Sequence, residues 1–306
     1  MPAFPDIDQA HVLKFTETVQ HLSQQRDCRF AGKVEEKSCM GEQAQAVIQL
    51  TEGDMGSLAA PTAGGGSYDG WMGDTDWDSV EHLQRWILPS AYKRALPIHS
   101  RDLTQMLTDP RSQYAQNIVA AYNRRKDDTL IAAALGNATT GKFDAQAATA
   151  LPAGQIITAG DIVNGLTVTK LLDTWEKMRA AEAVQDMDQL YFTTSAKGLR
   201  ELLDSTEVKS ADYNTVKALA AGEINSFMGF EFIRTERLPG GVGYRSDFAH
   251  AKSGLCLGKW QDIDIRVDER PDKNYTWQIY GSCFHGAVRT EEVKVVQVDC
   301  KDASYT

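Results

Sequence analysis

The ligand spacing closest to a known metal site is Asp74-x-Asp76-x-Asp78, because carboxylates at alternate positions open the calcium-binding loop of an EF-hand. That loop also needs a glycine at its sixth position and a bidentate glutamate at its twelfth. Ser79 and Arg85 occupy those two positions here. We therefore interpret the stretch as a solvated acidic loop and predict no bound metal.

Two glycine clusters share little with phosphate-binding loops beyond their composition. Gly64, Gly65 and Gly66, and the run 240–243, lack the lysine and hydroxyl residue of a P-loop. Neither has the strand-to-helix setting of a dinucleotide-binding turn, and no G-x-S-x-G or H-E-x-x-H motif occurs. The sequence therefore indicates no catalytic or cofactor-binding residue, and we expect a protein that is not an enzyme.

The histidines and cysteines show no spacing typical of a reactive cluster. The six histidines are scattered, and His11 and His21 would face different sides of a helix. No C-x-x-C pair occurs among the five cysteines, so we expect free thiols that are mostly small buried side chains. They are Cys28, Cys39, Cys256, Cys283 and Cys300.

Composition indicates a globular protein of one large domain or two smaller ones. The 306 residues are 42% hydrophobic and 24% charged. No run approaches the roughly 18 apolar residues of a membrane span, and the N-terminus lacks the features of a signal peptide, so we expect a cytosolic origin and no membrane partner. A net charge of −10 argues against high-affinity binding of nucleic acid by the surface as a whole.

The long element that organises this chain is a helix expected over residues 110–135, about 39 Å in length. Asp109 is a suitable N-cap, Pro110 suits the first helical position, and Gly136 stands where a left-handed C-cap is expected. The helix is apolar near both ends but polar from 123 to 129.

A helix that is polar all round its middle either bridges separate bodies or is an ordinary long helix with a solvated middle, and the sequence leaves both interpretations open. Within this stretch Arg124, Arg125 and Lys126 form a basic patch, which Asp127 and Asp128 follow at once. We interpret the patch as a solvated, self-paired helix face.

A long hairpin arm is expected ahead of this helix. Strand-like segments at 46–50 and 82–88 flank a stretch that contains seven glycines, with Trp71 and Trp77 inside it. Two indoles without a local core are either buried against another chain or folded back on their own subunit, and both readings stay open.

A self-contained α/β lobe is expected after the helix. It comprises helices at 159–183, 195–203 and 214–221 and strands at 190–194 and 230–236. The core face predicted for its first helix consists of Ile162, Leu166, Leu171, Leu172, Trp175 and Met178.

The C-terminal part of the chain, from about residue 262, is expected to form β-sheet. Alternating strands are expected at 262–268 and 275–284, and the apolar residues between 293 and 298 slip by one position, which a bulge would absorb. These strands need an apolar partner, and the two apolar ends of the long helix are the best candidates.

Several segments, taken in order, resemble the major capsid proteins of tailed bacteriophages, which have the HK-ninety-seven-type fold. The most specific are L-T-D-P-R-S-Q-Y-A-Q at 107–116 and D-D-T-L-I-A-A-A-L-G at 127–136, with Thr140-Gly141 beyond. Further similar segments lie at 15–32, 222–233 with Leu238-Pro239, 268–273 and 286–289.

This resemblance implies an α+β fold with a long spine helix, an antiparallel sheet in a peripheral domain, an α/β axial domain, an N-terminal arm and an extended β-hairpin loop. The corresponding ranges are 1–42 for the arm, 43–90 for the hairpin loop, 91–158 with 256–306 for the peripheral domain, and 159–255 for the axial domain. The lysine–asparagine pair that cross-links some relatives was not located, so no covalent bond between subunits is predicted.

The function implied is a coat subunit that assembles into pentamers and hexamers of an icosahedral head around double-stranded DNA. The virion capsid, built in the host cytoplasm, would be its location, and portal, scaffold and decoration proteins its further partners. Expected assembly contacts are Gly64, Gly65, Gly66, Trp71, Trp77, Arg124 and Arg125. An encapsulin-like compartment, which shares the fold, remains an alternative function. A soluble α/β enzyme is a second, less favoured alternative.

Overall fold

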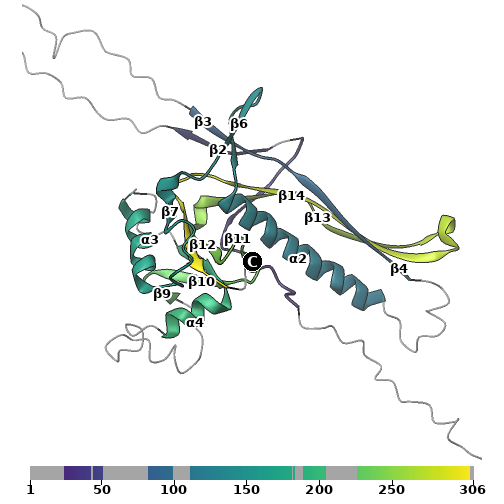
Figure 1. The fold of residues 1–306 in the computed structure, drawn as a ribbon. Helices are drawn as coiled ribbons and strands as arrows, with labels where there is room; N and C mark the ends of the chain where they lie inside the picture. Colours follow the sequence, from purple (N-terminus) through teal and green to yellow (C-terminus); the bar gives the residue numbers. More distant parts are fainter. Residues whose placement is uncertain are drawn as a thin grey trace, which may run out of the picture.

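The computed structural model describes residues 24–42, 44–50, 82–98, 111–180, 182, 189–204 and 226–303. Helix α2 (Arg111–Leu135) runs diagonally between two bodies of sheet (Figure 1). One body carries helices α3 (Val168–Ala180) and α4 (Ala196–Asp204). The other ends in the long hairpin of β13 (Leu255–Arg270) and β14 (Thr276–Arg289), which projects beyond the helix (Figure 1). No helix among the described residues is long and apolar enough to cross a membrane.

Helix α2 confirms the expected long helix to within one residue at its start, while Asp109 and Pro110 lie outside the described residues. Its C-terminus differs from the prediction, because Gly136 does not have a left-handed conformation. The Gly136 N–H instead donates to the Ala132 carbonyl at 2.8 Å, and a Cβ on Gly136 would lie 2.5 Å from that oxygen. Glycine is therefore required for close approach of the backbone.

The last carbonyls of α2 are capped by a side chain from far along the sequence. The fully buried Arg289 guanidinium donates to the carbonyls of Ala134 at 3.0 Å and Gly136 at 2.8 Å, and to that of Thr149 at 3.2 Å. A cation at this position also complements the negative end of the helix dipole. Tertiary contacts thus replace the local glycine cap that the sequence suggested.

The first body is a seven-stranded sheet with the order β7-β15-β12-β8-β10-β9, to which β11 adds beside β12. Its strands β8 and β10 are parallel, whereas β12 is antiparallel to both β8 and β15. The strands are β7 (Ile156–Ile157), β8 (Leu190–Thr194), β9 (Ser226–Phe227), β10 (Phe230–Arg234), β11 (Gly240–Gly241), β12 (Tyr244–Ala251) and β15 (Val295–Lys301).

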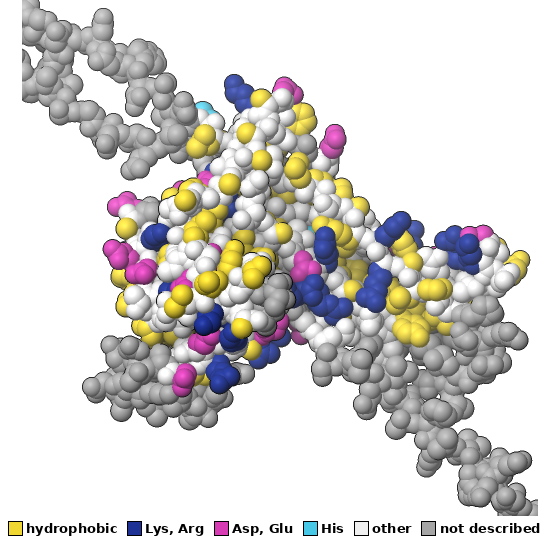
Figure 2. Space-filling view, in the orientation of Figure 1, with side chains coloured by type: hydrophobic (Ala, Val, Ile, Leu, Met, Phe, Trp, Pro, Cys, Tyr) yellow, Lys and Arg dark blue, Asp and Glu magenta, His cyan; other side chains and the backbone are white. Residues whose placement is uncertain are grey.

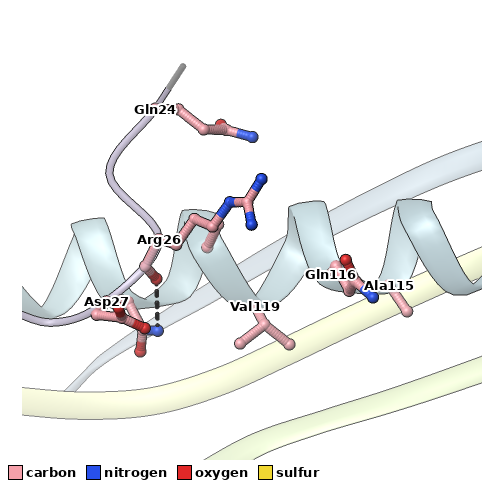
Figure 3. Close-up of a pocket in the computed structure, with 8 residues that line it drawn as sticks. Gln24, Arg26, Asp27, Ala115, Gln116 and Val119 are labelled. Carbon is pink, nitrogen blue, oxygen red and sulfur yellow. Dashed lines mark hydrogen bonds between the residues drawn. The ribbon is translucent and has the colours of Figure 1, made fainter. Parts of the chain in front are cut away.

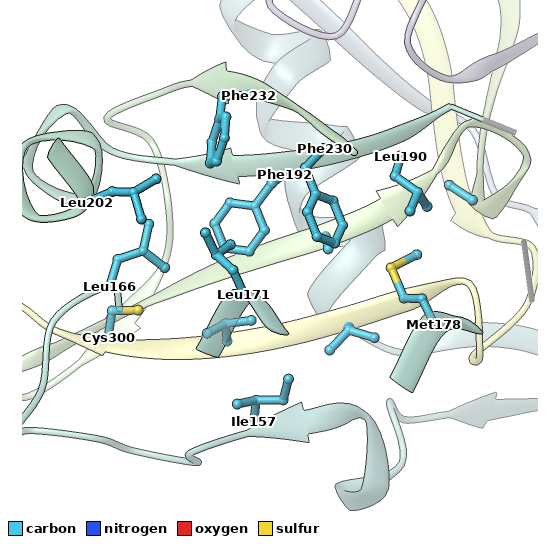
Figure 4. Packing of buried hydrophobic residues seen from close by; sticks show 14 residues of the cluster. Ile157, Leu166, Leu171, Met178, Leu190, Phe192, Leu202, Phe230, Phe232 and Cys300 are labelled. Atoms are coloured by element: carbon cyan, nitrogen blue, oxygen red, sulfur yellow. The ribbon is translucent and has the colours of Figure 1, made fainter. Parts of the chain in front are cut away.

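One face of this sheet is covered by α3 (Val168–Ala180) and α4 (Ala196–Asp204). Phe192 and Phe230 meet edge to face at the centre of the core, with ring centroids 5.9 Å apart, and Leu171 and Met178 of α3 pack beside them (Figure 4). The strands expected at 190–194 and 230–236 and the helix at 195–203 are confirmed within two residues. The helix expected at 214–221 lies outside the described residues.

Helix α3 begins later than predicted, at Val168 rather than near 159. Thr158 and Gly160 have positive φ, and the Asp161 side chain accepts the N–H of Val163 at 2.8 Å, so the chain turns there instead of coiling. Three residues predicted to face the core are exposed by 57%, 48% and 38% respectively, because the first lies before the helix and the other two lie outside its buried face of Lys170, Leu171, Thr174 and Met178. They are Ile162, Leu172 and Trp175.

The second body is built on a four-stranded sheet with the order β1-β13-β14-β4. Its strands are β1 (Glu35–Ser38), β4 (Ser90–Ile98), β13 (Leu255–Arg270) and β14 (Thr276–Arg289). The strands expected at 262–268 and 275–284 are therefore parts of a longer hairpin. A third sheet, β2-β3-β5-β6, pairs the two flanks of the hairpin loop with residues after the helix. It comprises β2 (Ala44–Leu50), β3 (His82–Ile87), β5 (Ala138–Lys142) and β6 (Ala145–Thr149).

Both ends of α2 pack as expected against the C-terminal strands. Near its start, Ile118 clusters with Ile98 and Ile279, and near its end Leu130 and Ile131 join the core between the two bodies. Contact at the first site requires Gly281 of β14, since a Cβ there would lie 2.4 Å from Ile118 Cγ2.

Strand β15 departs from two expectations. It pairs with β12 in an unbroken register, so the predicted bulge is absent, and Val293 lies in the turn before the strand. Val295, Val296 and Val298 are all buried because both faces of the sheet are covered, with Val296 and Val298 in the core under α3 and Val295 in the core beside the end of α2. Its residues, expected in the same body as 256–289, belong instead to the seven-stranded sheet.

Candidate functional site

The polar middle of α2, residues 123–129, is where segments from three parts of the chain meet. We predicted either a bridge between bodies or a solvated middle, and the structure shows a bridge. Lys126 and Asp127 are buried, with Asp127 fully inaccessible. The charged side chains here contact other elements, so the interpretation of 124–126 as a self-paired solvated face was wrong.

Asp127 holds the segment that leads in from the N-terminus. Its two carboxylate oxygens each accept the backbone N–H of Arg29 at 3.1 Å, and Oδ1 accepts the Cys28 thiol at 2.9 Å. Gln25 donates a further hydrogen bond from its side-chain amide. Burial raises the pKa of Asp127 despite these donors, and burial with the nearby carboxylate raises the pKa of Cys28 to about 12. Cys28 is therefore a hydrogen-bond donor rather than a reactive thiolate.

Asn123 and Arg124 extend this contact by one turn. The Asn123 side chain donates to the Arg26 carbonyl at 2.8 Å, and Arg124 donates to the Gln25 carbonyl at 2.8 Å and the Gln24 side chain at 3.0 Å. A groove of about 320 Å³ lies beside these bonds, between the segment 24–27 and the helix (Figure 3).

One turn beyond Arg124, on the same face of the helix, Asp128 contacts the seven-stranded body. Arg237, which follows β10, forms a two-pronged ion pair with the Asp128 carboxylate. The Arg237 side chain remains 38% exposed, so this pair orients the two elements more than it stabilises them.

Another side of the helix rests on the four-stranded sheet through aromatic rings. The Arg125 guanidinium lies over the ring of Tyr92 in β4 at 4.3 Å, and the Lys126 ammonium lies over Tyr122 at 4.8 Å. His285 of β14 lies between the two tyrosines, 5.1 Å from Tyr92 and 5.9 Å from Tyr122. Burial, followed by the charges of Lys126 and Arg125, lowers the pKa of His285 to about 4, so its ring is neutral at pH 7.

The seven-stranded body contains a separate buried polar cluster around Arg245. This fully buried guanidinium donates to Asp247 at 3.0 Å, Asp302 at 3.1 Å and Glu201 at 3.3 Å. It ties the last residues after β15 to β12 and α4. All its donors face carboxylates, and we interpret it as a structural ion-pair network.

Of the predicted site residues, the structure brings Arg124 and Arg125 to this junction, where they contact different segments. Gly64, Gly65, Gly66, Trp71 and Trp77 lie outside the described residues, as does the acidic loop at 74–78. The run 240–243 forms a tight hairpin between β11 and β12, with Gly243 at a φ of +82°. All five cysteines are free, as expected.

Sequence reasoning missed Asp127, Tyr92 and Arg237 as members of one site. Only Asp127 had a sequence feature that could have singled it out, as an acid that directly follows a basic run inside a helix. Arg85, which we read only as a residue that disqualifies a calcium loop, forms an ion pair with Glu292 at 2.6 Å.

Comparisons with known proteins identify the family and the solved structures that share this fold. A family model described as phage capsid protein matches residues 7–302. A comparison with curated proteins gave no match.

Solved structures share the fold at low identity. The capsid of cyanophage P-SCSP1u is 16% identical with a TM-score of 0.70, covering 97% of this chain and 94% of that chain. The capsid of cyanophage Pam1 is 12% identical with a TM-score of 0.70, covering 99% and 100%. The acid-stable capsid of Helicobacter pylori bacteriophage KHP30 is 11% identical with a TM-score of 0.68, covering 98% and 99%.

The α+β fold is thus that of phage capsid structures, with a long helix joining a hairpin-bearing sheet to an α/β body. Because the family model covers nearly the whole sequence, the chain belongs to the phage capsid protein family.

Proposed function

We propose that this chain is the major coat subunit of a phage head and assembles with copies of itself into pentamers and hexamers around double-stranded DNA. The observation that carries the proposal is the family match over residues 7–302. We propose a structural role for the chain. Asp127, Cys28 and His285, whose pKa values are shifted by burial, then hold the junction together by packing and hydrogen bonding.

The junction on α2 supports a division of labour within the subunit. We propose that the seven-stranded body is the axial domain, that the four-stranded sheet with α2 is the peripheral domain, and that residues before β1 form the arm. Because Asp127, Asp128 and Arg125 fix three segments to one rigid helix, the two bodies behave as one unit while the arm and hairpin loop adapt to five- and six-membered rings. Many modest contacts then add up through multivalency.

Deleting residues 64–73 tests this proposal. We expect the variant to give a folded subunit, with circular dichroism and thermal unfolding close to those of the parent, that forms no closed shells by negative-stain electron microscopy. The parent chain is the matched control and should form shells under the same conditions. If the parent forms no particles at any concentration, the coat-subunit proposal is wrong, whereas normal shells from the deletion would remove only the role of the hairpin loop.

A further inference from the structure

Lysine and arginine side chains gather over helix α2 and the neighbouring strands in Figure 2. Five cations line three hollows beside this helix, and they come from the segment before β1, from β4, from α2 and from the segment after β10. They are Arg26, Lys93, Arg94, Arg125 and Arg237, and we call the surface that they form the basic face. The carboxylates that line the same hollows are Asp27 and Asp128, and Asp128 is already paired with Arg237. The basic face therefore carries a surplus of positive charge.

The exposed side chains of α2 and β4 do not neutralise the basic face. The acids of α2 are the buried Asp127 and the paired Asp128, and β4 contains no acid. No ion pair among the described residues involves Lys93, Arg94 or Arg125, and all three are exposed. The described side chains of α2 that are exposed are neutral or basic, namely Gln116, Val119, Arg125 and Ala132.

Like charges from separate elements lie close together on this face. Burial, followed by the charges of Arg237 and Arg94, lowers the pKa of Arg124. The Arg125 guanidinium is oriented by the ring of Tyr92, over which it lies at 4.3 Å. An anionic partner would relieve the repulsion between these cations.

The basic face contrasts with the charge of the chain as a whole. Residues 38–84 hold eight acidic side chains and neither lysine nor arginine, so they account for −8 of the net −10. In Figure 1 the ends of β2 and β3 that lead toward this stretch lie on the far side of the molecule from β4 and the start of α2. Positive charge is thus concentrated on α2 and β4 although the protein is acidic.

We propose that the basic face lines the interior of the shell and binds phosphates of the packaged duplex through Lys93, Arg94 and Arg125. The proposal deepens the coat-subunit function and rests on it, because that function places duplex DNA against one surface of every subunit. Four of the five cations of the face are arginines, whose planar guanidinium groups can donate two hydrogen bonds to one phosphate.

The contact is expected to be independent of base sequence. Bases are read by a helix or a β-ribbon that enters a groove of the duplex, whereas α2 lies between the two bodies of sheet and β4 lies along the edge of one sheet (Figure 1). The cations therefore reach the backbone, where contact with one phosphate is exchanged for contact with the next. A single subunit binds weakly, and many subunits around one genome add up.

Binding of a fluorescently labelled duplex of about 30 base pairs to the full-length subunit, followed by anisotropy, tests the contact. With three phosphates engaged, the affinity should fall roughly 40-fold between about 50 and 200 mM salt, because each contact releases counterions from the DNA. Lys93→Gln with Arg94→Gln should lower the slope of log affinity against log salt by about 2. Lys142→Gln with Arg200→Gln, which removes one exposed lysine and one exposed arginine from β5 and α4, is the matched control and should keep the slope of the parent.

Three results of this measurement would overturn the proposal. The first is a parent subunit that does not bind the duplex at about 50 mM salt, and the second is an equal loss of slope in the control. The third is equal competition by a poly-glutamate chain of matched total charge, which would assign the face to an acidic protein segment. We expect poly-glutamate to compete at least about tenfold less well, because its charges are less dense than those of the duplex.

Lysine acetylation of the parent chain locates the contact without any substitution. In the presence of the duplex, mass spectrometry should show Lys93 acetylated about threefold or more slowly, with Lys142 unchanged. Equal rates at Lys93 with and without DNA would overturn the assigned site, even if the subunit binds the duplex elsewhere.

Closed shells test the direction of the basic face. Shells of the parent chain should bind added duplex at least about tenfold less than free subunits do, because the face is turned inward. Shells that bind it as well as free subunits would overturn the inward orientation. Failure of the parent to form shells counts against the coat-subunit function, whereas the DNA contact is decided on the free subunit, so the two failures are distinguishable.

Discussion

The carboxylate of Asp127, fully buried in α2, accepts the backbone N–H of Arg29 at 3.1 Å from each of its oxygens, across 98 residues of sequence. This contact attaches the segment before β1 to the helix that carries the rest of the subunit. An ionised acceptor makes a stronger hydrogen bond than a neutral one, so the carboxylate itself is important.

Asp127→Asn should therefore loosen this segment. The asparagine side chain has one oxygen acceptor and no charge, so it cannot accept from Cys28, Gln25 and the Arg29 N–H as the carboxylate does. We expect a loss of about 1–3 kcal/mol in the free energy of unfolding of the subunit. Limited trypsin digestion should cut faster after Arg26 and Arg29. Asp128→Asn, which removes a half-exposed ion pair, is the matched control, and equal effects of the two changes would contradict the special role of Asp127.

His250 predicts a pH dependence of stability. The ring is fully buried against Phe30, Tyr191 and Phe248, and burial lowers its pKa to about 3. The unfolded chain, with an ordinary pKa near 6.5, binds more protons between these values, so stability falls as the pH drops from 6.5 toward 3. The loss from this group should reach roughly 2 kcal/mol by pH 5.

Urea unfolding of the subunit at a series of pH values checks this prediction. His250→Phe, which keeps an aromatic ring in the stack, should make the stability profile between pH 6.5 and 4 less steep, leaving the slope that His285 contributes through its own lowered pKa. The exposed His82→Gln is the control and should retain the slope of the parent. A profile for His250→Phe as steep as that of the parent would mean that another group is responsible.

Gly281→Ala tests the close approach of α2 to β14. The added Cβ would lie 2.4 Å from Ile118 Cγ2, so the helix or the strand must shift, at a cost of about 1–3 kcal/mol in unfolding free energy. Combining it with Ile118→Ala should give less than the sum of the two single losses, because the clash is removed. Gly154→Ala, where nothing lies within 4 Å, is the control for glycine replacement in general.

Neighbouring leucines in α3 test the corrected phase of that helix. Leu171 is fully buried and Leu172 is 48% exposed. Leu171→Ala should cost about 2–5 kcal/mol, and Leu172→Ala less than about 1 kcal/mol, in the unfolding free energy of the isolated subunit. Similar losses at both positions would restore the face predicted from the sequence.

Sequence patterns correctly predicted those helices and strands whose structure is decided by residues close to them in the sequence. Helix α2, strands β8 and β10 and helix α4 were predicted within two residues, because capping residues, periodicity and short apolar runs act over a few positions. The errors arose where a distant group took over. Arg289 replaced the expected cap at Gly136, and the turn at Thr158 and Gly160 delayed α3.

The sequence by itself determined the family and the long helix with a polar middle. It could not show what the polar middle of α2 is for, because its partners lie about 100 residues earlier, at Gln25 and Arg29, and about 100 or more residues later, at Arg237 and His285. Only the tertiary structure brings these groups together. The physical reason is that a buried charge must find its hydrogen-bond partners in space, wherever the folded chain supplies them.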